Sequence, residues 1–132
     1  MAILKIKCDC GQIIETSVGD KICNNKLFWF QSYYCNYCGK TVETDSEDMI
    51  PSDIKNAIIA EEGSYGLIIC NIRDRAKIEF LLKKMPEDNL FNFKPFLERK
   101  SEEIIRGTQN EVLIVKNYLD KKGMRDCMVR RY

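Results

Sequence analysis

Histidine is absent from this chain of 132 residues. The imidazole ring is the commonest general base in enzymes and the usual protein ligand of catalytic zinc, so neither role can be filled by histidine in this chain. The sequence also lacks a glycine-rich phosphate loop and a nucleophile motif. Adjacent carboxylates occur at Glu61–Glu62 and Glu102–Glu103, but neighbouring side chains diverge in a helix or a strand, which favours solvated surface. We therefore expect a protein that is not an enzyme.

Long apolar runs are missing as well. No segment approaches the roughly 18 to 20 consecutive apolar residues that a membrane-spanning helix requires. Hydrophobic residues make up 45% of the chain and charged residues 31%, a balance typical of globular proteins. The first residues, "MAILKIKCDC", reach lysine and cysteine too early to contain the apolar core of a signal peptide. We expect a cytoplasmic protein with no membrane partner, in a compartment that keeps thiols reduced.

Seven cysteines in a reducing compartment need a role other than disulfide formation. Two close pairs stand out, Cys8 and Cys10 in "KCDCGQIIE" and Cys35 and Cys38 in "YYCNYCGKTVE", and a glycine directly follows each pair. A metal knuckle must reverse the backbone so that two thiolates reach one ion, about 2.3 Å from each sulfur. A residue at positive φ after the second cysteine makes this turn, and glycine adopts it without a steric cost.

Residues 3–45 resemble a zinc ribbon with the pattern C-x-C-G…C-x-x-C-G. The resemblance implies a structural Zn²⁺ held by four thiolates, Cys8, Cys10, Cys35 and Cys38, with no position left open for a reactive water. The ion would contribute apparent binding energy on the order of 10 kcal/mol to a segment too short to stabilise itself. The first pair departs from the usual C-x-x-C spacing by one residue. This departure leaves Cys8 in question as a ligand, with Cys23 as the alternative.

A C-x-x-C pair also occurs in redox-active dithiols. Such a pair usually lies at the N-terminus of a helix beside a β-α-β pattern, where the helix dipole lowers the pKa of one thiol. The residues after Cys38, "GKTVETD", favour a strand instead, which argues against the redox interpretation. A third interpretation is that the cysteines are merely buried, but two glycine-terminated pairs within 31 residues argue against that as well.

An aromatic run, "NKLFWFQSYY", lies between the two pairs. Alternation along a strand sends Phe28 and Phe30 to one face and Trp29 and Tyr33 to the other. Exposed rings could stack on unpaired bases, but no basic residue follows the first lysine of the run, so phosphate contacts are missing. We expect instead that one face covers the knuckles and that the other docks on a second domain.

Residues 43–53, "ETDSEDMIPSD", are acidic and polar and contain a proline, which indicates a domain boundary. A short helix is predicted next, because Ile54, Ala57 and Ile58 share one face and Gly63 ends the pattern. Its narrow apolar stripe predicts a connector packed on the second domain. We assign residues 1–45 to the zinc ribbon, 46–65 to an acidic linker with this helix, and 66–132 to the second domain.

The second domain begins with the apolar run "GLIICNI", which predicts a buried strand. Two helical segments follow, "RDRAKIEFLLKKM" and "NFKPFLERK", the latter with Pro95 in its first turn. "SEEIIRG" fits either a strand or a helix tail. "TQNEVLIVKNYLDKKG" predicts a helix with Thr108 and Glu111 as a capping box, and "MRDCMVRRY" predicts a last strand. Cys70 and Cys127 fall inside apolar strand runs and are expected to be small core residues.

The β-α-α-β-α-β order of residues 66–132 resembles the C-terminal domain of the bacterial ribosomal stalk protein. It also resembles the related fold of the Clp-protease adaptor that captures N-degrons. The closest stretch is "EEIIRGTQNEVLIVKNYLDKKGMRDCMV". Both families are protein-docking modules without catalysis, and no site residue of either can be carried over. The predicted fold class is α+β, with a small antiparallel ribbon followed by a compact β-α-α-β-α-β domain.

The charge is uneven along the chain, with a net charge of −4 over residues 1–66 and +4 over residues 94–132. We expect a non-enzymatic, zinc-binding interaction or adaptor module, in the style of antidote or immunity proteins, whose protein partner is basic. The alternative is a nucleic-acid-binding or ribosome- or transcription-associated zinc ribbon, in which Arg125, Arg130 and Arg131 contact phosphates. The acids interspersed among these arginines favour ordinary surface charge over that alternative.

Overall fold

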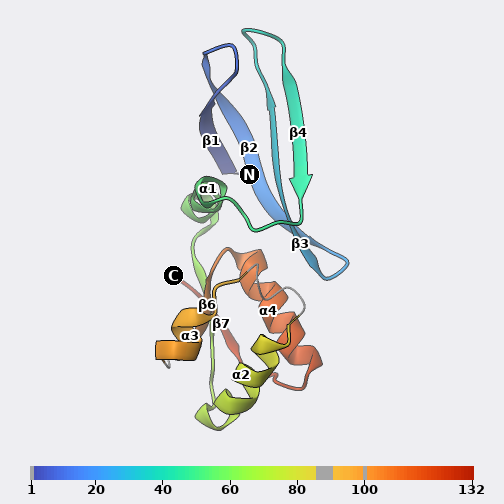
Figure 1. Ribbon diagram of the computed structural model, residues 1–132. Coiled ribbons are helices and arrows are strands. Elements are labelled where there is room, and N and C mark those ends of the chain that lie inside the picture. Colours follow the sequence, from blue (N-terminus) through green and yellow to red (C-terminus); the bar gives the residue numbers. More distant parts are fainter. Residues whose placement is uncertain (1, 86–90, 100) are drawn as a thin grey trace. The chain divides into compact units, whose positions relative to one another are not determined.

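A computed structural model describes residues 2–85, 91–99 and 101–132 of the chain. The chain forms two compact units, Met1–Gly63 and Ser64–Tyr132. Each unit combines an antiparallel sheet with helical structure, which confirms the predicted α+β class (Figure 1). None of the helices in the described ranges is long and apolar enough to cross a membrane.

The first unit contains a four-stranded antiparallel sheet in the order β1-β2-β3-β4. Its strands are β1, Ala2–Lys7; β2, Ile13–Cys23; β3, Lys26–Tyr34; and β4, Thr41–Ser46. Only Asn24 and Asn25 connect β2 to β3, with φ angles of 53° and 62°. Two successive residues at positive φ are typical of the type I′ turn, whose twist matches that of a β-hairpin. The loops β1–β2 and β3–β4 lie together at the other end of the sheet (Figure 1).

One face of this sheet is buried beneath helix α1, Ser52–Glu62. The strand residues on this face include Ala2, Thr16, Val18 and Leu27, all nearly inaccessible to solvent. The helix packs against β1 and β2 and buries Ile54 and Ile58. The prediction that this helix packs on the second domain is therefore wrong. The apolar stripe of this helix indicates that one of its faces is buried, but the stripe does not show which element buries that face.

The second unit contains a three-stranded antiparallel sheet in the order β6-β5-β7. Its elements are β5, Tyr65–Ile68; the 3₁₀ turn η1, Ile72–Asp74; α2, Arg75–Lys83; α3, Lys94–Arg99; β6, Glu103–Gly107; α4, Gln109–Lys121; and β7, Met128–Arg131. This is the predicted β-α-α-β-α-β order, and "SEEIIRG" contributes a strand. The apolar side chains buried most completely in the described part of this unit are Leu67, Ile78, Leu82, Phe96, Ile104, Val112, Val115 and Leu119.

Helix α4 begins with the predicted capping box. The hydroxyl of Thr108 accepts a hydrogen bond from the backbone N–H of Glu111 at 3.1 Å, and the Glu111 carboxylate accepts one from the backbone N–H of Thr108 at 3.0 Å. Cys127 is buried, as expected of a small core residue. Cys70 is exposed, so the same prediction for this residue is wrong. Strand β5 ends at Ile68, two residues before Cys70, although the apolar run continues.

Candidate metal centre

The four paired cysteines lie in the two loops at one end of the first sheet. In the first loop the backbone N–H of Cys8 donates to the carbonyl oxygen of Gln12 at 2.8 Å. In the second loop the N–H of Cys35 donates to the carbonyl oxygen of Lys40, also at 2.8 Å. Both loops therefore close with the same hydrogen bond between their ends, although the first is one residue shorter. We call them the first knuckle, residues 8–12, and the second knuckle, residues 35–40.

A glycine turns the backbone inside each knuckle. Gly11 has a φ of 93° and Gly39 a φ of 77°, and their N–H groups donate to the carbonyl oxygens of Cys8 and Cys35 at 2.8 Å. A Cβ atom added to either glycine would meet no other atom within 4 Å. Glycine is thus required for the backbone angle, which L-residues with a Cβ adopt at a cost, and not for lack of space. The predicted reason for the two C-G pairs is confirmed.

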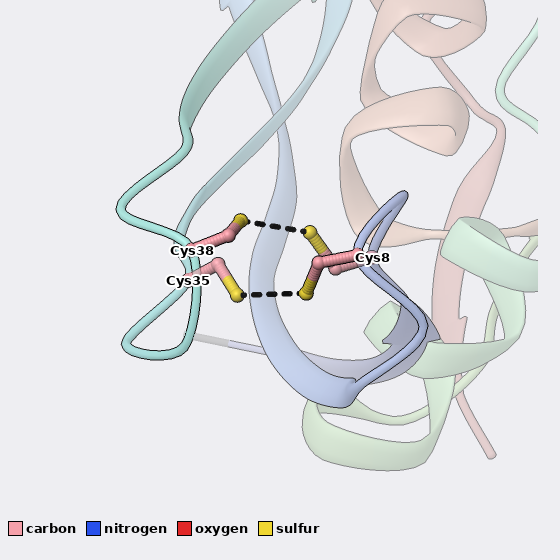
Figure 2. A group of neighbouring side chains, drawn as sticks. Cys8, Cys35 and Cys38 are labelled. Carbon is pink, nitrogen blue, oxygen red and sulfur yellow. Dashed lines mark hydrogen bonds between the residues drawn. The ribbon is translucent and has the colours of Figure 1, made fainter.

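The thiols of the two knuckles face one another (Figure 2). The sulfur of Cys8 lies 3.6 Å from that of Cys38, and the sulfur of Cys10 lies 3.7 Å from that of Cys35. All four sulfurs lie within 4.8 Å of one another. Four sulfurs placed tetrahedrally about 2.3 Å from a zinc ion are about 3.8 Å apart, whereas a disulfide bond is about 2.0 Å long. The spacing suits four ligands of one metal ion.

Cys23 is not part of this cluster. It is the last residue of β2, whose first residue, Ile13, adjoins the first knuckle. Ten residue steps along a strand cover about 33 Å, so Cys23 lies near the opposite end of the sheet. The structure therefore brings Cys8, and not Cys23, to the other three cysteines. The shorter spacing of the first pair does not prevent its two thiols from converging with the second pair.

The cluster is half buried. Cys8 and Cys35 are 2% and 0% exposed, whereas Cys10 and Cys38 are exposed. Only Ile14 joins the two buried thiols as a buried apolar neighbour among the described residues, with Ile6 and Tyr33 packed partly against them. The contact with Tyr33 agrees with the expectation that one face of the aromatic run covers the knuckles. Two of the three buried residues at this end of the sheet are thus the thiols themselves.

The pKa values of Cys35 and Cys38 are shifted in opposite directions. Burial raises the pKa of the Cys35 thiol, but the backbone N–H groups of Cys38 and Tyr37 and the neighbouring thiols outweigh it and lower the pKa to about 7. The N–H of Lys40 lowers the pKa of Cys38, yet the adjacent Cys35 sulfur and burial raise it to about 12. A thiolate therefore forms first at Cys35 and opposes ionisation at Cys38.

A charged pair connects the two knuckles. The ammonium group of Lys40, in the second knuckle, donates a hydrogen bond to the carboxylate of Asp9, in the first. This contact lowers the pKa of Asp9 and raises that of Lys40. The side chains are 41% and 84% exposed, so solvent screens the pair. Lys40 nevertheless places a positive charge beside the thiols. Its position directly after the C-x-x-C-G motif is the feature of the sequence from which this charge could have been predicted.

The arginines proposed to contact phosphates lie in the second unit. Arg130 and Arg131 belong to β7, Arg125 precedes that strand, and all three are exposed. No family model matches the chain, and neither curated proteins nor solved structures match it.

Proposed function

We propose that the chain is a non-enzymatic protein-interaction module whose first unit is a zinc ribbon. The observation that carries the zinc assignment is the convergence of four sulfurs, within 4.8 Å of one another, from two knuckles of one antiparallel sheet. Four thiolates complete the tetrahedral coordination that zinc prefers, so a bound ion offers no open position to water or substrate. Zinc held in this way stabilises a fold and does not catalyse a reaction.

A docking role is supported by the charge and by the second unit. The exposed acidic residues of β4 and of the segment after it, Glu43, Asp45, Glu47 and Asp48, give the first unit a surface suited to a basic partner. The second unit has the element order shared by the ribosomal stalk domain and the Clp-protease adaptor, both of which bind proteins. That likeness is one of pattern, and it supports a docking role without naming the partner.

Metal analysis of the purified protein tests the zinc assignment. We expect one zinc ion per chain, lost in Cys35→Ser and Cys8→Ser because a three-sulfur site binds the ion more weakly. Cys23→Ser is the matched control, since this thiol lies at the other end of the sheet, and it should keep its zinc. Full zinc content in Cys35→Ser, or loss of zinc in Cys23→Ser but not in Cys8→Ser, would contradict the proposed ligand set.

Nucleic-acid binding is the second candidate, favoured by one observation in the second unit. The strand register places Arg106 and Arg130 on either side of Gly66. The ring of Tyr132 stacks 3.7 Å from the guanidinium carbon of Arg106. Cationic and aromatic side chains together suit phosphates and bases. A gel-shift assay at low salt with single- and double-stranded RNA and DNA tests this candidate, and the absence of any shift would remove it.

A further inference from the structure

The first sheet has a second face, turned away from the one that α1 covers. We call it the open face. Its residues come from all four strands and include Lys5 on β1, Glu15 and Ser17 on β2, Phe30 and Ser32 on β3, and Glu43 on β4. The strand register aligns them in rows across the sheet. One row consists of Ser17, Ser32 and Glu43, and the next consists of Gly19, Phe30 and Asp45.

The row of serines makes the open face concave. Ser17 and Ser32 are small, whereas Phe30 and Tyr34 stand on either side of Ser32 along β3. Two shallow hollows of about 460 and 350 Å³ open in this region, and both are lined by Ser32 and Glu43. Glu43 thus lies where the two hollows meet, between one aromatic ring and the other.

The carboxylates around the hollows differ in their partners. Asp45 pairs with Lys21 at 3.4 Å. Glu43 and Glu15, which line the hollow beside Tyr34, make no ion pair with any residue in the described part of the chain. Lys5 lies opposite Glu15 in the strand register, whereas the row of Glu43 contains no basic residue. Glu43 and the ring of Tyr34 in the same hollow thus place negative charge beside an aromatic wall. This combination suits a cation from another molecule.

Lys21 shows within the chain how such a cation can be held. Its ammonium group lies 6.0 Å from the ring centre of Phe28 and 5.9 Å from that of Phe30, and it pairs with Asp45. The other side of Phe30, above Ser32, offers the same combination of a ring and a carboxylate, with Glu43 in the place of Asp45. Lys21 also lines the hollow that contains Phe30, Ser32 and Glu43. Among the described residues, no cation lines the adjoining hollow, where Glu43 and Tyr34 lie.

Strand β4 adds a second means of recognition. It is the last strand of the sheet, and within the described ranges its outer edge pairs with no other strand. A free edge can accept an extended peptide through main-chain hydrogen bonds, while alternate side chains of that peptide turn to one face. Basic side chains at alternate positions of an added strand would therefore lie beside Glu43.

We propose that the open face and the free edge of β4 form a docking surface for an extended, basic segment of a partner protein. An arginine or lysine of that segment sits above Ser17 and Ser32, between Phe30 and Tyr34, with its charge on Glu43. This inference rests on the proposed protein-interaction function and names the surface and the partner's chemistry. A second β4 strand is a poor occupant, because it would bring its own carboxylates against these.

Selection from a library of randomised seven-residue peptides, with the zinc-loaded full chain as bait, tests the proposal. We expect the enriched peptides to carry arginine or lysine at alternate positions. Glu43→Gln should weaken their binding about tenfold, and added salt should weaken it further. Glu61→Gln, an exposed carboxylate on α1, is the matched control and should bind as the unchanged chain does. Amide chemical shifts should move in β4, Phe30 and Ser32.

Zinc content and tryptophan fluorescence establish that Glu43→Gln remains folded. Enriched peptides without alternating basic residues, or equal binding by Glu43→Gln, would overturn the docking surface. Amide chemical-shift changes confined to the second unit would also overturn the docking surface, but they would be consistent with the proposed interaction function. The unchanged chain could instead form a dimer that the substitution Lys5→Glu dissociates. The occupant would then be β1 of a second copy, and the proposal of a separate partner protein would be overturned. If no peptide is enriched, the docking surface is overturned, whereas the interaction function, which does not require an extended partner segment, is not.

Discussion

The two units are of similar length but differ in the side chains that they bury. The second unit buries three phenylalanines, Phe91, Phe93 and Phe96, among many aliphatic side chains. The first unit has no aromatic side chain of comparable burial in its described residues, and at the knuckle end only Ile14 accompanies two buried thiols. A short unit with so small an apolar core needs a further source of stability, which a metal ion can supply. The comparison predicts that the units respond independently to different perturbations.

Metal removal should have the largest effect, and it should act on the first unit alone. A structural zinc contributes apparent binding energy on the order of 10 kcal/mol, more than a unit of this size retains without it. Trp29 is the only tryptophan and lies on β3, so its fluorescence reports on the first unit. A strong chelator should change this fluorescence while most of the helical circular dichroism remains, because three of the four α-helices in the described ranges belong to the second unit.

Two outcomes of the chelator experiment would contradict the independence of the two units or the role of the metal in the first. If helical signal and fluorescence disappear together, the units form one cooperative structure. If neither changes when zinc is fully removed, the ion does not support the fold of the first unit.

Phe96→Ala should act on the second unit alone. The side chain is fully buried, and the guanidinium carbon of Arg75 lies 4.2 Å from the centre of its ring. Truncating a buried phenylalanine costs about 3–5 kcal/mol of unfolding free energy. The helical transition in thermal denaturation should shift down while zinc content stays at the unchanged level. Phe80→Ala is the control on α2, because Phe80 is 56% exposed and its truncation should cost less than about 1 kcal/mol. A loss of zinc in Phe96→Ala would contradict the independence of the units.

Gly39→Ala should weaken the metal centre without removing it. A residue with a Cβ at a φ of 77° costs about 1–2 kcal/mol, and this cost falls on the knuckle that presents Cys35 and Cys38. Zinc affinity, measured by competition with a chromophoric chelator, should fall by about tenfold. Gly39→Asn should lose less, since asparagine tolerates left-handed backbone better. Equal affinity in both variants and the unchanged chain would show that the knuckle does not need this angle.

Thr108→Ala should have an effect similar in size to that of Gly39→Ala, but on the stability of the second unit. Loss of an N-terminal cap costs about 1 kcal/mol and up to about 2 kcal/mol where the cap is well formed. Thr108 is 1% exposed and completes a reciprocal pair with Glu111, so we expect a value toward the upper end. Denaturant titration followed by circular dichroism measures the change. Gln109→Ala, at an exposed position in the same turn, should change stability little, and a similar loss in both variants would argue against the cap.

The features of this chain that can be predicted from its sequence are those that depend only on neighbouring residues, such as turns and helix caps. The C-G pairs predict knuckles because the glycine angle is a local requirement, and T-x-x-E predicts a cap for the same reason. The choice between Cys8 and Cys23 could not be made from spacing, since it depends on which end of the first sheet each thiol occupies. Cys70 was misplaced because an apolar run does not reveal where its strand ends.

The local sequence likewise does not show which element packs against the apolar stripe of a helix. The stripe of α1 fitted a covered helix, but its cover is the first sheet and not the second domain. The pairing of Asp9 with Lys40 needed both knuckles to be placed before the two charges could meet. Each of these features depends on strands that are distant in sequence, and the order and register of strands cannot be read from a single segment.

The turn at Asn24 and Asn25 determines the alignment of the metal ligands from the opposite end of the sheet. Its two residues set which positions of β2 and β3 face each other, and this pairing runs from Cys23 and Lys26 to Ser17 and Ser32. Beyond that point β2 and β3 lead to the first and the second knuckle. One residue inserted into the turn would shift the pairing and turn alternate side chains to the opposite face. The thiols would then separate although no ligand had changed. A two-residue turn about 33 Å away along β2 thus sets how the first knuckle is placed relative to the second.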